Sequence, residues 1–211
     1  SQLEALAKAI IESLSRPYFI DRTQMSIGAS VGVAVSPDHG RSDEDLTRNA
    51  DLALYAAKGG GRGRFRFYSS DLLQAAEDRR ILEEDLRDAL SKGQMWLAYQ
   101  PVVDSASNMV TGFEALLRWN HPERGPISPA LFIPIAEEAN LIGSLGEWAL
   151  EKACEEAVKW PGKMKVAVNV SPNQFANASL PKIIEAALAT SGLAPSRLEL
   201  EITEGEESVR I

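Results

Sequence analysis

From residue 93 onward the chain alternates between strand-like and helix-like segments, and this order constrains the fold more than any other feature. The helical segments repeat apolar residues every three or four positions, whereas the strand segments alternate apolar with polar residues. We expect strands at 95–103, 109–118, 165–171 and 197–203, and helices at about 129–139, 144–160 and 181–191. Strands that alternate with helices form α/β layers or barrels, so this part of the chain is predicted to be of the α/β class.

Three of these strands combine an apolar face with a face that carries oxygen-bearing side chains. Because side chains alternate along a strand, Glu114 and Arg118 share one face, and Asn169 points away from its valine neighbours. Glu201 opposes the leucine and isoleucine beside it in the same way. Glu114, Asn169 and Glu201 lie late in their strands, where the functional groups of (β/α) barrels gather.

The donor atoms of these side chains indicate which metal would suit them. Carboxylate and amide oxygens, without histidine or cysteine, favour a hard cation such as Mg²⁺ or Mn²⁺. Glu114, Asn169 and Glu201 are therefore candidate metal ligands. The alternative is that they are isolated polar residues at strand ends or on surface strands, and the spacing alone leaves both interpretations open.

The first 70 residues have a pattern of their own. We expect a helix over 3–15, a strand over 27–35, a helix that begins after Ser42 and ends at the glycine run 59–61, and a strand over 64–68. Lys58 and Arg62 flank that glycine run. A helix C-terminus offers carbonyl groups rather than amides, so this pattern alone favours a solvated helix end over a phosphate site.

Composition excludes several classes of protein. The net charge of −8 argues against binding of polymeric nucleic acid, which needs a broad basic surface, although a small anionic ligand needs only a few cations. No apolar run approaches the ~20 residues of a membrane span. The single cysteine, Cys154, excludes an intrachain disulfide, fits a reducing cytoplasm and is expected to be a packed core thiol.

Five segments of the chain occur in the order typical of EAL domains, the phosphodiesterases that open the bacterial second messenger cyclic di-GMP. They are Tyr99-Gln100-Pro101, Glu114-Ala115-Leu116-Leu117-Arg118-Trp119, Phe132-Ile133-Pro134-Ile135-Ala136-Glu137, Asn169-Val170-Ser171 and Glu201-Ile202-Thr203-Glu204. Over about 120 residues the sequence resembles that family. The resemblance implies the first half of a modified (β/α)8 barrel and two-metal hydrolysis of one phosphodiester bond, which gives linear pGpG.

The resemblance also implies roles for individual residues. It assigns Glu114, Asn169 and Glu201 to two Mg²⁺ or Mn²⁺ ions, Arg118 to a phosphate of cyclic di-GMP, Gln100, Leu116 and Pro134 to the ligand pocket, and Glu204 to catalysis by positioning a downstream loop. A regulatory module that binds cyclic di-GMP without cutting it would use Gln100 and Arg118 equally well. That module is the alternative to a phosphodiesterase.

The N-terminal part resembles a second family. Segments 26–34, 49–58 and 61–62 are similar to the C-terminal third of GGDEF domains, which make cyclic di-GMP. By this resemblance Lys58 and Arg62 contact nucleotide phosphates, while Gly63 stands where the family commonly has asparagine. The GGDEF loop that holds the metals for cyclisation does not occur in this sequence, so we expect no cyclase activity from it.

We therefore expect the C-terminal part of a GGDEF domain at 1–69, a helical linker at 70–92 and the N-terminal part of an EAL domain at 93–211. The alternative for 70–92 is a helix that packs on the following domain. Half a barrel is expected to be inactive by itself, whereas the intact protein is expected to hydrolyse cyclic di-GMP. The location is expected to be cytoplasmic, or the cytoplasmic part of a membrane-anchored protein. EAL domains often work as dimers, so a homodimer through this domain is also expected, although no residue pattern marks an interface.

Two aromatic residues near the site are expected to have structural roles. His121 precedes a proline, which favours a loop role over that of a general base. Trp119 is expected to pack in the core, with a place at the border of the pocket as the alternative.

Overall fold

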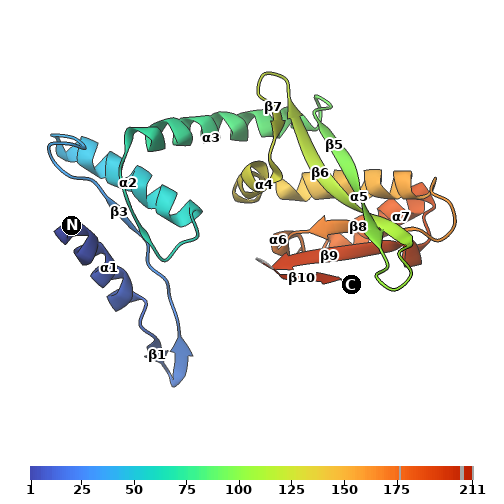
Figure 1. Cartoon of the computed structure of the whole chain (residues 1–211), viewed down its shortest axis with the longest axis horizontal. Coiled ribbons are helices and arrows are strands. Elements are labelled where there is room, and N and C mark those ends of the chain that lie inside the picture. Colours follow the sequence, from blue (N-terminus) through green and yellow to red (C-terminus); the bar gives the residue numbers. More distant parts are fainter. Residues whose placement is uncertain (176, 205–206, 211) are drawn as a thin grey trace. The chain divides into compact units, whose positions relative to one another are not determined.

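A computed structural model of the chain describes residues 1–175, 177–204 and 207–210 (Figure 1). It divides into two compact units, Ser1–Arg80 and Ile81–Ile211, and the division falls inside helix α3 (Ser70–Ala89). Each unit contains its own helices and strands. Within the described residues, no helix has the length and apolar character needed to span a membrane.

The first unit is a small α/β assembly. Its elements are α1 (Gln2–Leu14), β1 (Tyr18–Ile20), β2 (Thr23–Met25), β3 (Val31–Val33), α2 (Asp43–Gly59) and β4 (Phe65–Phe67). Strands β1 and β2 form an antiparallel hairpin, and β3 pairs with β4 in parallel. Helix α2 lies so close to β3 that a Cβ atom on Gly32 would be 2.0 Å from the carbonyl oxygen of Ala50. Position 32 therefore requires glycine.

The strand predicted over 27–35 is shorter in the structure. Only Val31–Val33 has strand geometry, because its partner β4 also supplies just three paired residues. Ile27 is exposed and lies outside any strand. The sequence alternates over the whole range, but alternation becomes a strand only where a neighbour accepts the backbone hydrogen bonds.

The second unit is built on one mixed sheet. Its strands are β5 (Met95–Val103), β6 (Val110–His121), β7 (Gly125–Ile127), β8 (Lys165–Val170), β9 (Leu198–Glu204) and β10 (Glu207–Arg210), in the order β10-β9-β8-β6-β5 with β7 against β6. Strands β6, β8 and β9 are parallel, whereas β5 and β6 form an antiparallel hairpin. The predicted α/β class is confirmed.

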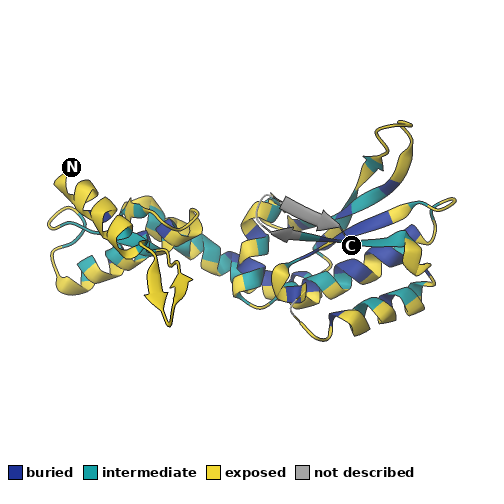
Figure 2. Cartoon of the chain, turned by 90° about the horizontal axis from the view of Figure 1, so that it is seen from below, coloured by how far each residue is buried: buried dark blue, intermediate teal, exposed yellow. Residues whose placement is uncertain are grey.

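Helices cover one face of this sheet and form two hydrophobic clusters. They are α4 (Pro129–Glu138), α5 (Ile142–Ala157), the short α6 (Pro172–Phe175) and α7 (Leu180–Ser191). In one cluster Val166, Val168 and Val170 of β8 pack against α5 and α7. In the other, the C-terminal half of α3 packs with Trp119 and α4. Figure 2 shows this burial, in contrast with the exposed hairpin β1–β2.

Cys154 belongs to the first of these clusters. Its side chain is fully buried on α5, and burial raises the pKa of the thiol to about 11. A thiol with so high a pKa stays protonated near neutral pH and is a poor nucleophile. The structure thus agrees with the predicted packed thiol.

Arg197 joins three elements of the second unit. Its Nε donates to the carbonyl oxygen of Met164 at 2.8 Å, and its Nη2 donates to those of Ala157 at 2.6 Å and Trp160 at 3.4 Å. These carbonyl groups lie at the end of α5 and just before β8, while Arg197 itself precedes β9. One guanidinium group therefore fixes the end of a helix and the starts of two parallel strands.

Replacing Arg197 with alanine is expected to lower the free energy of unfolding of the second unit by about 2–3 kcal/mol, because charge-assisted hydrogen bonds to backbone carbonyls are lost. All four tryptophans lie in this unit, so tryptophan fluorescence during urea unfolding reports on it. Arg87→Ala is the control: Arg87 makes an exposed ion pair with Glu83, and its loss should cost no more than about 0.5 kcal/mol. Equal effects of the two substitutions would contradict the prediction.

Candidate functional site

Glu114 and Asn169 are brought together by the parallel pairing of β6 and β8. Glu114 is paired with Ala167, and Asn169 lies two residues further along β8, on the same face as Ala167. The Nδ2 atom of Asn169 donates a hydrogen bond of 2.7 Å to Oε1 of Glu114. Two of the three predicted metal ligands are therefore in direct contact, although 55 residues separate them along the chain.

Glu201 lies on the next strand. The register of β8 and β9 pairs Asn169 with Glu201, and Glu201 is only 4% exposed. The three oxygen-bearing residues thus stand on three consecutive strands of the sheet. Strand parity predicted this placement, because each residue lies on the face opposite the apolar side chains of its own strand.

Gln100, Leu116 and Arg118 lie on the same face of the sheet as Glu114. The hairpin register pairs Gln100 with Glu114, while Leu116 and Arg118 follow Glu114 at alternate positions of β6. The guanidinium Nη1 of Arg118 donates 3.0 Å to the carbonyl oxygen of Leu117. The arrangement puts one permanent cation four residues beyond a carboxylate on a single strand.

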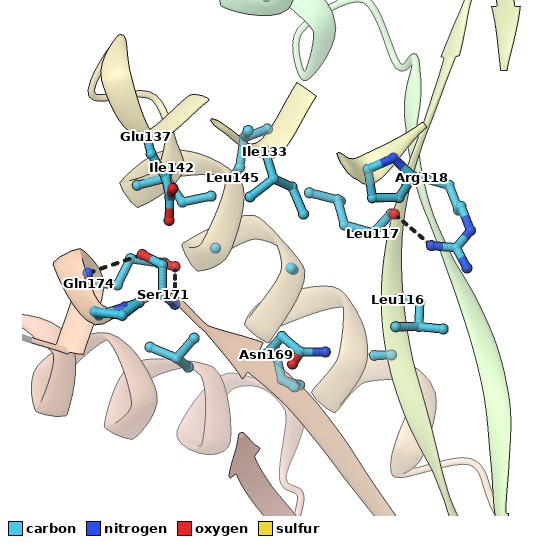
Figure 3. Close-up of a pocket in the computed structure, with 17 residues that line it drawn as sticks. Leu116, Leu117, Arg118, Ile133, Glu137, Ile142, Leu145, Asn169, Ser171 and Gln174 are labelled. Carbon is cyan, nitrogen blue, oxygen red and sulfur yellow. Dashed lines mark hydrogen bonds between the residues drawn. The ribbon is translucent and has the colours of Figure 1, made fainter. Parts of the chain in front are cut away.

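A pocket of about 350 Å³ opens where β6 and β8 end, and helices α4 and α5 form its other walls (Figure 3). Leu116, Arg118 and Asn169 lie on one side of it, and Glu137 and Gln174 lie on the other. Its wall is mostly apolar, which suits the flat faces of a ligand ring, and Arg118, Glu137, Asn169 and Gln174 add polar groups to that wall. Pro134 sits on α4 but is exposed, and Ile133 and Glu137 line the pocket from that helix.

The donor set fits part of a site for a hard divalent cation. Glu114 and Glu201 supply carboxylates and Asn169 supplies an amide oxygen, the oxygen chemistry that Mg²⁺ and Mn²⁺ prefer. Within the described residues, no group of three or more His, Cys, Asp or Glu side chains has the arrangement of a metal site. The described site therefore rests on two carboxylates and one amide.

Comparison with known families decides what this second unit is. Residues 83–210 match the family model of the EAL domain, and residues 1–64 match that of the diguanylate cyclase GGDEF domain. The chain belongs to the EAL family. Both resemblances predicted from the sequence are confirmed.

Two curated proteins are similar to this chain over nearly all of its length. A signaling protein of Caulobacter vibrioides is 47% identical over 199 residues, which is 94% of this chain and 25% of that protein. MucR of Pseudomonas aeruginosa, a bifunctional diguanylate cyclase/cyclic di-GMP phosphodiesterase, is 41% identical over 94% of this chain and 30% of MucR. The chain thus spans less than a third of these relatives' length.

A solved structure of the PaMucR phosphodiesterase in complex with c-di-GMP resembles the EAL part. The TM-score is 0.57 with 44% sequence identity, and the match covers 59% of this chain and 52% of that chain. The EAL fold of the second unit is therefore shared with an enzyme whose structure contains the dinucleotide.

The remaining predicted residues of the EAL and GGDEF parts are placed as follows. Glu204 is the last residue of β9, and its side chain lies outside the described part of the structure. Lys58 is exposed in the last turn of α2, in the GGDEF part. Arg62 follows with a positive φ of 54°, and its N–H donates 3.3 Å to the carbonyl oxygen of Lys58. A backbone hydrogen bond therefore joins the two residues at the helix end.

Two structural features of the EAL part were not predicted. The first involves Ser171 and Gln174: Oε1 of Gln174 accepts 3.1 Å from the N–H of Ser171, and the Ser171 hydroxyl accepts 3.3 Å from the N–H of Gln174. The sequence Ser-Pro-Asn-Gln is the pattern of a capping box, a serine followed three residues later by glutamine. That sequence pattern is therefore a signal from which the pairing of Ser171 with Gln174 could be predicted.

The second feature is a buried histidine. His121 is 5% exposed, its Nδ1 accepts the N–H groups of Glu123 and Arg124 at 3.2 Å, and its Nε2 lies 3.1 Å from Oδ2 of Asp85 on α3. An Nδ1 that accepts leaves the proton on Nε2, which then donates to the carboxylate. The predicted loop position is wrong, because His121 is the last residue of strand β6, where its ring is buried against Trp119 and Asp85. The link to α3 has no signal in the sequence.

Trp119 is also a packing residue. It is 1% exposed, its indole Nε1 donates 3.0 Å to Oε1 of Gln94, and its ring meets Phe132 edge-on. The expected core role is confirmed, and the residue is not part of the pocket lining described above.

Replacing Asp85 with alanine is expected to destabilise the EAL part by about 1–2 kcal/mol, because the buried Nε2–H of His121 loses its acceptor. Urea unfolding followed by tryptophan fluorescence measures the change. The matched control is Asp88→Ala on the same helix, which removes only an exposed ion pair with Lys92 and should shift stability by less than about 0.5 kcal/mol. An Asp85→Ala midpoint equal to that of the control would refute the prediction.

Proposed function

We propose that the EAL part binds cyclic di-GMP and that, in the full-length protein, it hydrolyses one phosphodiester bond to give linear pGpG. The observation that carries the proposal is the contact of Glu114 with Asn169 beside Glu201, with Arg118 on the same face of the sheet. Carboxylate and amide oxygens for a metal, next to a cation for a phosphate, are what phosphodiester hydrolysis requires.

Glu114, Asn169 and Glu201 would hold Mg²⁺ or Mn²⁺, two ions in the intact domain. When bound, the ions would activate water and neutralise charge on the phosphodiester. Glu114 would have to exchange its hydrogen bond with the Asn169 amide for a metal contact, which requires only that the Asn169 side chain turn its oxygen toward the same point. Glu204 is proposed to position a downstream loop.

Arg118 would orient the dinucleotide by pairing with a phosphate, since its guanidinium group is always charged and offers several donors. Gln100, beside Glu114 in the hairpin, would contact the ligand from the neighbouring strand. Leu116 and Pro134 complete the proposed ligand contacts. Support comes from the structures of the PaMucR phosphodiesterase and of the Xanthomonas citri FimX EAL domain, both in complex with c-di-GMP.

The organisation of the chain is part of the proposal. Residues 1–69 are assigned to the C-terminal part of a GGDEF domain, 70–92 to a helical linker and 93–211 to the N-terminal part of the EAL domain. Lys58 and Arg62 are proposed to contact nucleotide phosphates in the GGDEF domain. A cytoplasmic location and a homodimer formed through the EAL domain complete the proposal.

The alternative is a regulatory module that binds cyclic di-GMP without cutting it. Arg118 and Gln100 would serve such a module equally well, whereas a module that only binds has no need of Glu114, Asn169 and Glu201 together. The presence of all three on adjacent strands favours hydrolysis.

Incubating the full-length protein with cyclic di-GMP and Mn²⁺ or Mg²⁺ is expected to yield pGpG, separated by liquid chromatography. Glu114→Gln is expected to lower the rate at least about 100-fold, because it replaces an anionic metal ligand with a neutral amide. Binding measured by calorimetry, together with a full absence of pGpG in both metals, would support the alternative. Absence of binding as well would reject both.

A polypeptide of these 211 residues alone is expected to show no turnover. In the described sheet β5 pairs only with β6, so one edge of β5 has no strand neighbour. An open edge of this kind invites association rather than a closed, water-excluding site. The same chromatographic assay tests this, with the intact mass checked beforehand, and pGpG formation by the 23.0 kDa polypeptide would overturn the expectation.

A further inference from the structure

Strand β8 ends at Val170, and a pair of reciprocal hydrogen bonds holds the segment that leads into α6. The Gln174 side chain accepts from the N–H of Ser171, and the Ser171 side chain accepts from the N–H of Gln174. Figure 3 shows this pair beside the pocket. Because Ser171 is the second residue after Asn169, this capping box of Ser171 and Gln174 fixes the backbone at the point where β8 ends.

The amide of Gln174 is itself held against the backbone of α5. A Cβ atom on Gly146 would lie 1.8 Å from Nε2 of Gln174 and 2.8 Å from its Cδ, so only glycine admits the amide group there. Gln174 is 9% exposed. Leu145, Ala149 and Leu150 of helix α5 are buried in the core, so the helix backbone against which the Gln174 amide lies is held in place.

We propose that Gln174, seated on Gly146, is a positioning residue for Asn169 and thereby sets the affinity of the site for divalent cations. Val168 and Val170 fix the buried face of β8, while the box fixes the direction in which the strand leaves the sheet. The Nδ2 atom of Asn169 is thereby kept 2.7 Å from Oε1 of Glu114. The inference rests on the proposed function of the same site.

If the two hydrogen bonds served only as a helix cap, their purpose would be to stabilise helix α6. Helix α6 spans only Pro172–Phe175, so there is little helix for a cap to stabilise. Burial of the glutamine amide against Gly146, rather than in solvent, indicates that the position of the segment between β8 and α6 is what is being fixed.

The test uses the full-length protein and Mn²⁺ alone, titrated by calorimetry without nucleotide. Gln174→Met keeps the side-chain length but removes the acceptor for Ser171, and it is expected to weaken Mn²⁺ binding about tenfold. Gln174→Glu keeps the acceptor and the capping-box pattern, so it should restore affinity to within about threefold of the unsubstituted protein. Gly146→Ala should weaken Mn²⁺ binding as much as Gln174→Met, because its Cβ displaces the amide.

Two further variants separate positioning from general damage. Asn177→Ala removes the hydrogen bonds of Asn177 to Ser179, three residues beyond Gln174, and should leave Mn²⁺ affinity unchanged. In a Gln174→Ala background, Gly146→Ala should have no additional effect, because the space for its methyl group has been vacated.

The outcomes are distinct. Lower urea midpoints with unchanged Mn²⁺ affinity in Gln174→Met and Gly146→Ala would show a cap and nothing more, and would overturn the inference. An unsubstituted protein that binds Mn²⁺ but forms no pGpG would reject the hydrolytic proposal while the titrations still decide the role of Gln174. An unsubstituted protein that binds no Mn²⁺ would reject both.

Discussion

The register of β8 between β6 and β9 is the constraint on which the rest of the site depends. Because side chains alternate along a strand, a slip of one residue would send Asn169 into the helix-covered core and a valine onto the site face. The valines of β8 oppose that slip, since Val166, Val168 and Val170 are each at most 2% exposed against α5 and α7. The hydrophobic core therefore determines the site, because it fixes the register that holds Asn169 beside Glu114 and Glu201.

Strand parity allowed much of this to be predicted. The pattern of apolar and oxygen-bearing residues placed Glu114, Asn169 and Glu201 on one face, because periodicity within a strand is a local property. The antiparallel pairing of β5 and the short length of β3 could not be predicted in this way, because the pairing partners of a strand are set by tertiary structure. The same holds for Asp85 with His121 and for Gly146 with Gln174: each pair joins elements whose packing no single segment encodes.

Gly32 and Gly146 each have a structural reason to be glycine. At Gly32 the backbone of α2 occupies the space of a side chain, and at Gly146 the amide of Gln174 does so. Both glycines lie at close approaches between elements rather than in turns. From the sequence alone, a glycine in a strand or helix is only a residue of unfavourable propensity. The structure shows why a larger residue would clash at these two positions.

Helix α3 is bound to the strand that carries the site. Leu82, Leu86 and Ala89 pack with Trp119, and Asp85 accepts from His121, so apolar and polar contacts both meet the last residues of β6. Glu114 and Arg118 belong to that same strand. Moving α3 relative to the EAL sheet would require these contacts to break together, because a buried imidazole without its acceptor carries a desolvation cost. The C-terminal half of α3 is for this reason packed as part of the second unit.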